Sequence, residues 1–90
     1  MEKAVKAVAK VDFTPNVLVT IMGTFSELGA NIDFKKDNYR VNAKSILGLL
    51  SISVLKGSEF EIFIEGNSGE IEIALEVFKA LSDYFTVVEE

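Results

Sequence analysis

The amino-acid sequence predicts an α+β chain of order βαββαβα, in which four strands and three helices form a two-layer sandwich with the helices on one face. Two patterns carry this prediction. Residues 59–65 alternate between mostly acidic side chains at odd positions and apolar side chains at even positions, with the period of a half-buried strand. Residues 17–28 and 71–85 repeat their apolar side chains every three or four positions, the period of an amphipathic helix. Ninety residues with 49% hydrophobic content suffice for one domain, residues 1–90, with a single core.

The first strand and the first helix are predicted from the first third of the chain. Alternation predicts the strand, with its apolar side chains at Val5, Ala7, Ala9 and Val11. Thr14 followed by Pro15 is typical of a helix start, because threonine caps the first turn and proline is tolerated at the first helical position. We expect this helix to end at Gly29. Its buried stripe is predicted to contain Val17, Leu18, Ile21, Met22, Phe25 and Leu28.

The remaining elements follow from similar signals. Ile32 and Phe34 alternate with charged residues in a second strand, and the turn residues Asp37 and Asn38 separate it from a third strand over 39–43. Ser45 is a good N-cap for a short helix, which we expect to end near residues 56–57. The fourth strand is 59–65. The last helix, capped by Ser68, is predicted to bury one face that consists of Ile71, Ala74, Leu75, Phe78, Leu81 and Phe85.

Composition and charge exclude several functions. Without cysteine or histidine, disulfides and thiol chemistry are excluded, and we expect neither a metal site nor a cofactor. Scattered lysines and a single arginine, Arg40, argue against nucleic-acid binding. No apolar stretch approaches the roughly 18 residues of a membrane span, and no signal peptide is visible, so we expect a cytoplasmic protein without membrane insertion. The net charge is +3 over residues 1–56 and −8 over residues 57–90. The acidic last third of the chain favours a protein partner that carries basic groups.

Two apolar features lie outside the expected core. Phe63 is placed among acidic residues on the polar side of the fourth strand. A second stripe on the last helix comprises Ile73, Val77, Ala80 and Tyr84. Contiguous exposed apolar side chains more often mark an interface than single ones do, so both features are candidate contacts with a partner or a second copy of the chain. Residues 86–88 have strand propensity and fit a sheet edge or a partner.

Residues 41–51 read Val-Asn-Ala-Lys-Ser-Ile-Leu-Gly-Leu-Leu-Ser. This segment resembles the regulatory-serine segment of HPr, the phosphocarrier of the bacterial sugar phosphotransferase system. Residues 56–62 and 66–75 are similar to that family's entry into its last strand and last helix, without a gap. The resemblance implies the HPr-like open-faced sandwich, with a four-stranded antiparallel sheet and three helices on one face. It also implies that Ser45 is a site of regulatory phosphorylation.

The departure from the family concerns its phosphorylated histidine, which lies in a Gly-(Leu/Ile)-His-Ala-Arg-Pro-Ala segment. Counted back from Ser45, Thr14 occupies the histidine position, Asn16 the arginine position and Val17 the proline position. Imidazole is nucleophilic near neutral pH, whereas a threonine hydroxyl needs an adjacent base. We therefore expect no histidine phosphotransfer, no catalytic residue and no enzyme activity.

Three functions remain open at this stage. The first is a regulatory or adaptor protein that acts by protein contact and is switched at Ser45, with Ile46, Leu47 and Leu50 as a docking surface. Its expected partners are HPr kinase/phosphorylase or a transcriptional co-regulator. The second is a structural or oligomerisation module that retains only the fold, in which Ser45 simply caps a helix. The third is a phosphocarrier component that uses another residue, for which Thr14 is the positional candidate.

Overall fold

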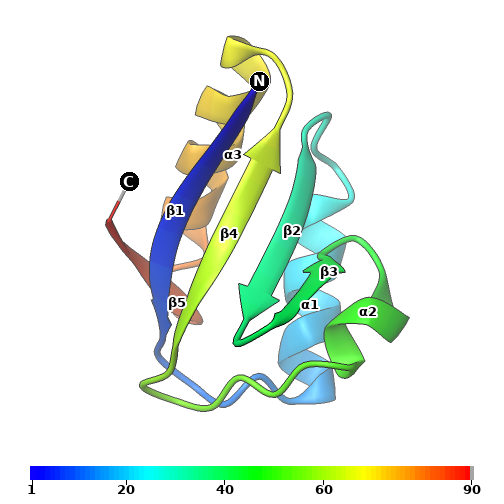
Figure 1. Cartoon of the computed structure of the whole chain (residues 1–90), viewed down its shortest axis with the longest axis vertical. Helices are drawn as coiled ribbons and strands as arrows, with labels where there is room; N and C mark the ends of the chain where they lie inside the picture. Colours follow the sequence, from blue (N-terminus) through cyan, green and yellow to red (C-terminus); the bar gives the residue numbers. More distant parts are fainter. Residues whose placement is uncertain (90) are drawn as a thin grey trace.

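The computed structural model describes residues 1–89, with side chains described for 1–88, as two layers (Figure 1). The chain forms, in order, β1 (Glu2–Ala9), α1 (Pro15–Phe25), β2 (Asn31–Lys36), β3 (Tyr39–Asn42), α2 (Ile46–Leu50), β4 (Glu59–Glu65), α3 (Ser68–Ala80) and β5 (Phe85–Glu89). The three helices lie on one face of the sheet, and the other face is open. The two-layer α+β arrangement predicted from the sequence is therefore confirmed.

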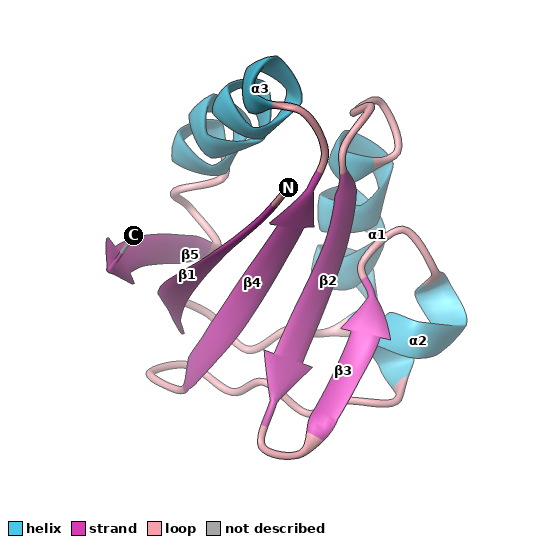
Figure 2. Cartoon of the chain, turned by 45° about the horizontal axis from the view of Figure 1, so that its top comes forward, coloured by secondary structure: helices cyan, strands magenta, loops and turns pink. Residues whose placement is uncertain are grey.

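The sheet is antiparallel throughout, with the strand order β3-β2-β4-β1-β5 (Figure 2). The central strand β4 pairs with β1 through Val5 opposite Ile62, and with β2 through Phe34 opposite Ile62. These side chains point to the helical face, where all three are buried. The residues that alternate with them along each strand point to the open face, because successive side chains of a strand point to opposite faces of the sheet.

The expectation of four strands is wrong, because the sheet has five. The last helix was predicted to reach Phe85, yet α3 ends at Ala80, and a turn over 81–84 leads into β5. Phe85 follows Leu81 by four positions, so a helix and a tight turn both return its side chain to the core. The β-branched residues at 86–88 favour the strand, which pairs with β1 through Thr86 opposite Val8.

Six of the seven phenylalanines form a connected aromatic core between the sheet and the helices. Phe34 is its centre, with ring centroids 5.0 Å from Phe60, 5.7 Å from Phe25 and 6.3 Å from Phe85. Many of the pairs meet edge to face, the arrangement that the ring quadrupole favours. The seventh ring, Phe63, lies on the open face of the sheet.

The ends of α1 and α2 and the cap of α3 also differ from the predictions. Ser68 is the first residue of α3 rather than its cap, because the side chain of Asn67 accepts the hydrogen bond from Glu70 N. α1 ends at Phe25 rather than Gly29, and Gly29 does not adopt the positive φ of a glycine that terminates a helix. A Cβ on Gly29 would instead lie 2.7 Å from Oε2 of Glu70, so a larger residue here would require the Glu70 side chain to shift. α2 ends at Leu50, before the predicted end near residues 56–57.

Candidate functional site

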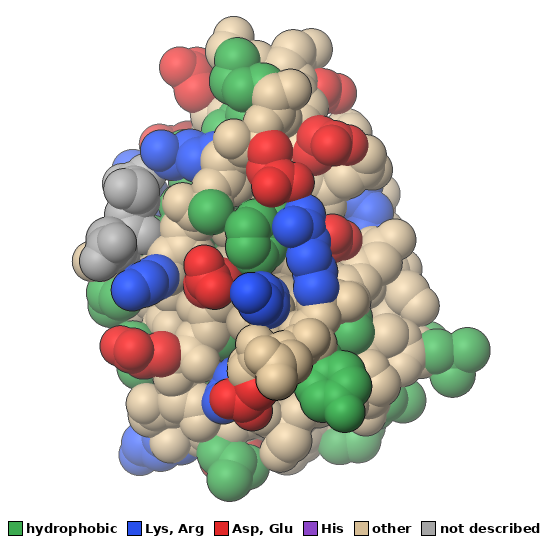
Figure 3. Space-filling model, viewed as in Figure 1, with side chains coloured by type: hydrophobic (Ala, Val, Ile, Leu, Met, Phe, Trp, Pro, Cys, Tyr) green, Lys and Arg blue, Asp and Glu red, His purple; other side chains and the backbone are tan. Residues whose placement is uncertain are grey.

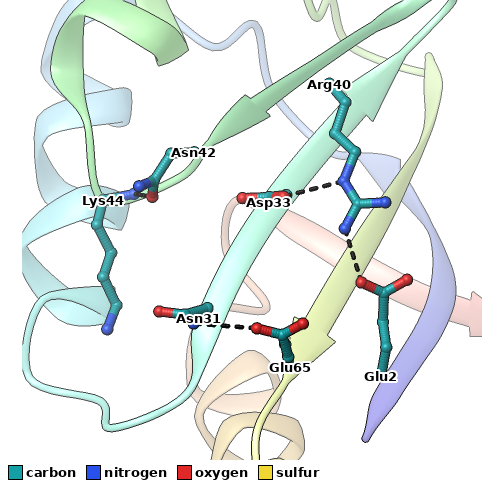
Figure 4. Close-up of polar contacts among 7 residues, drawn as sticks. All are labelled: Glu2, Asn31, Asp33, Arg40, Asn42, Lys44 and Glu65. Carbon is teal, nitrogen blue, oxygen red and sulfur yellow. Dashed lines mark hydrogen bonds and ion pairs between the residues drawn. The ribbon is translucent and has the colours of Figure 1, made fainter.

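Ser45 begins α2 at the point where the chain leaves the edge strand β3. Its main-chain N–H donates to Asn42 O at 3.0 Å, and its Oγ accepts from Gly48 N at 3.2 Å. The predicted N-cap is therefore confirmed. Lys44, directly before it, donates from Nζ to Leu28 O at 2.6 Å, which ties the segment to the loop that follows α1 (Figure 4). These bonds fix the half-buried serine at a defined place on the helical side of β3.

The short helix α2 presents apolar side chains to solvent beside this serine. Leu49 is buried and Ile46 packs partly against the core, whereas Leu47 is 81% exposed and Leu50 49% exposed. A helix of five residues has one inward face, so the remaining leucines point outward. Figure 3 shows hydrophobic side chains that protrude at the edge of the molecule where α2 lies. The sequence placed Ile46, Leu47 and Leu50 together as a surface; the structure gives that exposure to the two leucines only.

The position expected for a phosphorylated histidine lies at the start of α1. Thr14 caps this helix, with its Oγ1 accepting from Val17 N at 3.3 Å, and Pro15 follows as the first helical residue. Asn16 is exposed, and its carbonyl oxygen accepts from Thr20 Oγ1 at 3.1 Å. Figures 1 and 2 both place α1 beside α2. The contacts at Thr14 and Asn16 are those of an ordinary helix start.

Phe63, predicted as a candidate partner contact on the polar side of β4, does lie on the open face of the sheet, but it is half-buried rather than fully exposed. The guanidinium of Arg40 covers the ring, with Cζ 3.9 Å from the ring centroid. Arg40 is held there by Asp33, at 2.9 Å from Nε, and by Glu2, at 2.8 Å from Nη2 (Figure 4). We call these four residues the Arg40 cluster. A cation above the face of an aromatic ring is attracted by the ring quadrupole. The guanidinium therefore stays over the ring, and Phe63 is half-buried on the open face although no helix lies above it.

The Arg40 cluster joins four strands, and sequence reasoning did not foresee it. The hydrogen bond to Glu2, and then that to Asp33, raises the pKa of Arg40 above its ordinary value, so the guanidinium stays charged. The available signal was that the only arginine and the one phenylalanine outside the core pattern both fall on the polar sides of strands. Without the strand order, nothing in the sequence placed these two residues near each other.

The second apolar stripe is only partly an exposed surface. Ile73 is 59% exposed, and together with Val77 and Ala80 it lines a shallow hollow on the outer side of α3. Val77 also packs partly against the core. Tyr84 does not belong to the stripe, because α3 ends at Ala80 and Tyr84 lies half-buried in the turn before β5.

Two further properties concern membrane spans and metal binding. Within residues 1–89, no helix has the length and apolar character needed to cross a membrane. The same residues contain no grouping of three or more acidic, histidine or cysteine side chains that suits a metal ion. Two exposed residues that sequence reasoning did not select, Val19 on α1 and Leu55 after α2, are 50% and 58% exposed.

Comparison with known proteins identifies the class of protein to which this chain belongs. Residues 16–86 match the family model described as "PTS HPr component phosphorylation site". The chain belongs to the HPr family of the bacterial sugar phosphotransferase system. The matched region begins two residues after Thr14 and includes the Ser45 segment.

Within the family, the chain is similar to the HPr-like protein Crh of Halalkalibacterium halodurans, with 31% identity over 67 residues that cover 74% of this chain and 80% of the relative. Among solved structures, the phosphocarrier protein HPr of Bacillus anthracis is 31% identical, with a TM-score of 0.72 over 89% of this chain and 93% of its own. HPr-C-His of Thermoanaerobacter tengcongensis is 26% identical, with a TM-score of 0.66 over 89% and 92%.

Proposed function

We propose that this HPr-family protein is a cytoplasmic regulator that acts by contact with other proteins and is switched by phosphorylation of Ser45. The observation that carries the proposal is the exposure of Leu47 and Leu50 on the helix that Ser45 caps. A partner that docks on these leucines would lie against the serine, so a phosphate added there would change the docking surface directly. HPr kinase/phosphorylase and a transcriptional co-regulator are the partner types that the family suggests.

The physical effect of the modification follows from the local bonds. Ser45 Oγ now accepts one hydrogen bond, from Gly48 N. A phosphate carries about −1.5 to −2 charges and three acceptor oxygens, so it would strengthen contacts with main-chain N–H groups of the first turn. It would also place a strongly hydrated dianion beside Leu47, which disfavours an apolar partner and favours one that carries arginine or lysine.

We also propose that the protein does not transfer phosphate through histidine. The chain contains no histidine, and the hydroxyl at the corresponding position, that of Thr14, caps α1. Asn16 adds no positive charge to that helix start. Phosphate uptake from phosphoenolpyruvate should therefore fail, which leaves contact and Ser45 as the means of action.

The test is incubation with HPr kinase and ATP, read by intact mass. We expect the wild-type protein to gain one phosphate and Ser45→Ala to gain none. The matched control is Ser51→Ala, at the other end of α2, which removes a hydroxyl that donates to Gly48 O at 2.6 Å and should leave phosphorylation unchanged. Equal uptake by Ser45→Ala, or no uptake by the wild-type protein, would refute the switch.

The docking surface has its own test. Leu47→Ser should slow phosphorylation by the kinase, because the enzyme must contact α2 to reach its serine. Leu55→Ser removes an equally large exposed side chain outside the helix and should have no effect. If both substitutions slow the reaction to the same extent, contact through α2 is not specific.

The exposure of Ile73 favours a second candidate, an oligomerisation module that uses the hollow on α3. Sedimentation at high protein concentration distinguishes it. Under this alternative the wild-type chain associates and Ile73→Glu abolishes the association, whereas a strict monomer at every concentration excludes it.

A further inference from the structure

The two edges of the sheet are protected differently. At one edge, α2 packs directly against β3, so closely that a Cβ on Gly48 would lie 3.3 Å from Asn42 O. At the other edge, β5 pairs within residues 1–89 with β1 only. An uncovered edge strand presents main-chain N–H and C=O groups that can accept a further strand. The edge of β5 is therefore open to strand addition.

A groove runs along this edge between β5 and α3. Its volume is about 570 Å³, which is within the range of ligand-binding clefts. Leu75 of α3 and Val87 of β5 line it, and both pack partly against the core, so its floor is apolar. Figure 2 shows β5 at the end of the sheet with α3 above it. A helix beside an open strand edge offers main-chain pairing and side-chain pockets to the same extended peptide.

We propose that this groove binds an extended segment of a partner protein, which adds to β5 as a further strand and carries basic side chains toward α3. Glu72, Glu76 and Lys79 are exposed and line the groove from α3, so its rim carries two carboxylates and one ammonium group. Among the ion pairs of residues 1–89, Glu76 is paired with Lys79 at 3.1 Å and Glu72 takes part in none. The chain has a net charge of −5, so its overall field also attracts a basic segment.

A second copy of this chain fits the groove less well than a basic partner. If β5 paired with β5 of another molecule, each groove would face an identical acidic rim, and each chain has a net charge of −5. Like charges placed opposite each other across strands are destabilising. Charge complementarity therefore selects a partner of opposite sign and not self-association.

The geometry of β5 also sets the order of side chains in the ligand. Phe85 and Val87 face the helical side and Thr86 faces the open side, whereas the register shift between Lys6 and Ala7 of β1 leaves Val88, which is 54% exposed, without a partner on β1. Alternate residues of an added strand would likewise face the groove and the open side. The groove side requires an apolar residue for Leu75 and Val87 flanked by basic residues for Glu72 and Glu76, and the open side suits β-branched residues beside Thr86.

The probe that meets these requirements is the peptide acetyl-Thr-Lys-Val-Val-Thr-Lys-Val-amide, with fluorescence anisotropy or amide chemical shifts as the readout. We expect it to bind and to shift the main-chain amides of residues 85–88. Glu72→Lys should weaken binding about fivefold at low salt, as expected for one charged contact at the rim of an interface. Glu27→Lys is the matched control: it changes net charge equally at an exposed turn after α1 and should bind as the wild-type protein does.

Two further peptides test the mode of binding. Methylation of the main-chain nitrogens along one edge of the peptide should abolish binding, and methylation along the other edge should not, because only one edge pairs with β5. The analogue with glutamate in place of both lysines should bind at least about tenfold more weakly. Equal binding of the acidic analogue, equal tolerance of both methylated forms, or equal affinities of Glu72→Lys and Glu27→Lys would each overturn the proposal. Dimerisation through β5 that excludes the peptide would overturn it in favour of a second copy.

Discussion

Replacement of Arg40 by methionine tests the Arg40 cluster and the strand order that it depends on. Methionine keeps an apolar chain over Phe63 but removes the guanidinium, and with it the hydrogen bonds to Glu2 at 2.8 Å and Asp33 at 2.9 Å. The cation above the ring, 3.9 Å from its centroid, is lost as well. The substitution therefore removes electrostatic links between β3 and the strands β2, β4 and β1 at once.

The magnitude follows from the exposure of these groups. The side chains of Arg40 and Glu2 are each 41% exposed and that of Asp33 is 33% exposed, so solvent screens both ion pairs, which contribute about 0.2–1 kcal/mol each. The cation–π contact contributes about 0.5–1 kcal/mol at such a site. We expect Arg40→Met to lower the free energy of unfolding by about 1.5 kcal/mol. For a domain of this size that corresponds to a fall in Tm of about 6–12 °C.

The assay is thermal unfolding followed by circular dichroism, at low salt and at about 1 M salt, where screening should shrink the difference. Lys36→Met is the matched control, because it removes a single ion pair between neighbouring residues, at 3.3 Å from Asp37, and should change stability by less than about 0.5 kcal/mol. If both variants unfold at the same temperature, the Arg40 cluster contributes no stability and the reasoning is refuted.

Three other outcomes are expected. Phe85→Ala should cost about 3–5 kcal/mol in urea unfolding, because this side chain is fully buried in the aromatic core, and a loss below about 1 kcal/mol would contradict the position of β5. Ser45→Ala should cost about 1 kcal/mol by loss of the helix cap, whereas Ser45→Asp should retain most of that stability; equal melting temperatures for the two variants would argue against the cap. Thr14→His should take up little phosphate from phosphoenolpyruvate and the first enzyme of the system, because Asn16 leaves the helix start without its arginine, and a stoichiometric acid-labile product would show otherwise.

The sequence predicted correctly those elements whose periodic pattern extends over many residues or whose capping residues are specific. Thr14 with Pro15 located the start of α1, and the alternation of 59–65 located β4 with its bounds. The boundary between α3 and β5 was missed because a residue four positions after Leu81 satisfies helical spacing and also the return of a turn. Periodicity records which side chains are buried and not how the chain arrives there.

The candidate site was predicted in the same uneven way. Ser45 and its cap follow from local chemistry, and the outward position of Leu47 and Leu50 follows from the shortness of the helix. The covering of Phe63 depends on Arg40, which lies on another strand, and no local pattern records that contact. The groove beside β5 could not be predicted from the sequence either, because its prediction requires knowing both where α3 ends and that β5 pairs with β1.

The position of β1 in the sheet has a consequence for synthesis of the chain. β1 is the first strand of this sheet to leave the ribosome, yet its two neighbours are β4, which begins at Glu59, and β5, which begins at Phe85. Until those residues are made, the nascent chain carries an apolar, alternating strand without either native neighbour. Such long-range pairing delays folding, because a large loop must close before any contact is gained. Lys3 and Lys6 of β1 place charges along this unpaired strand, and such charges oppose association during that interval.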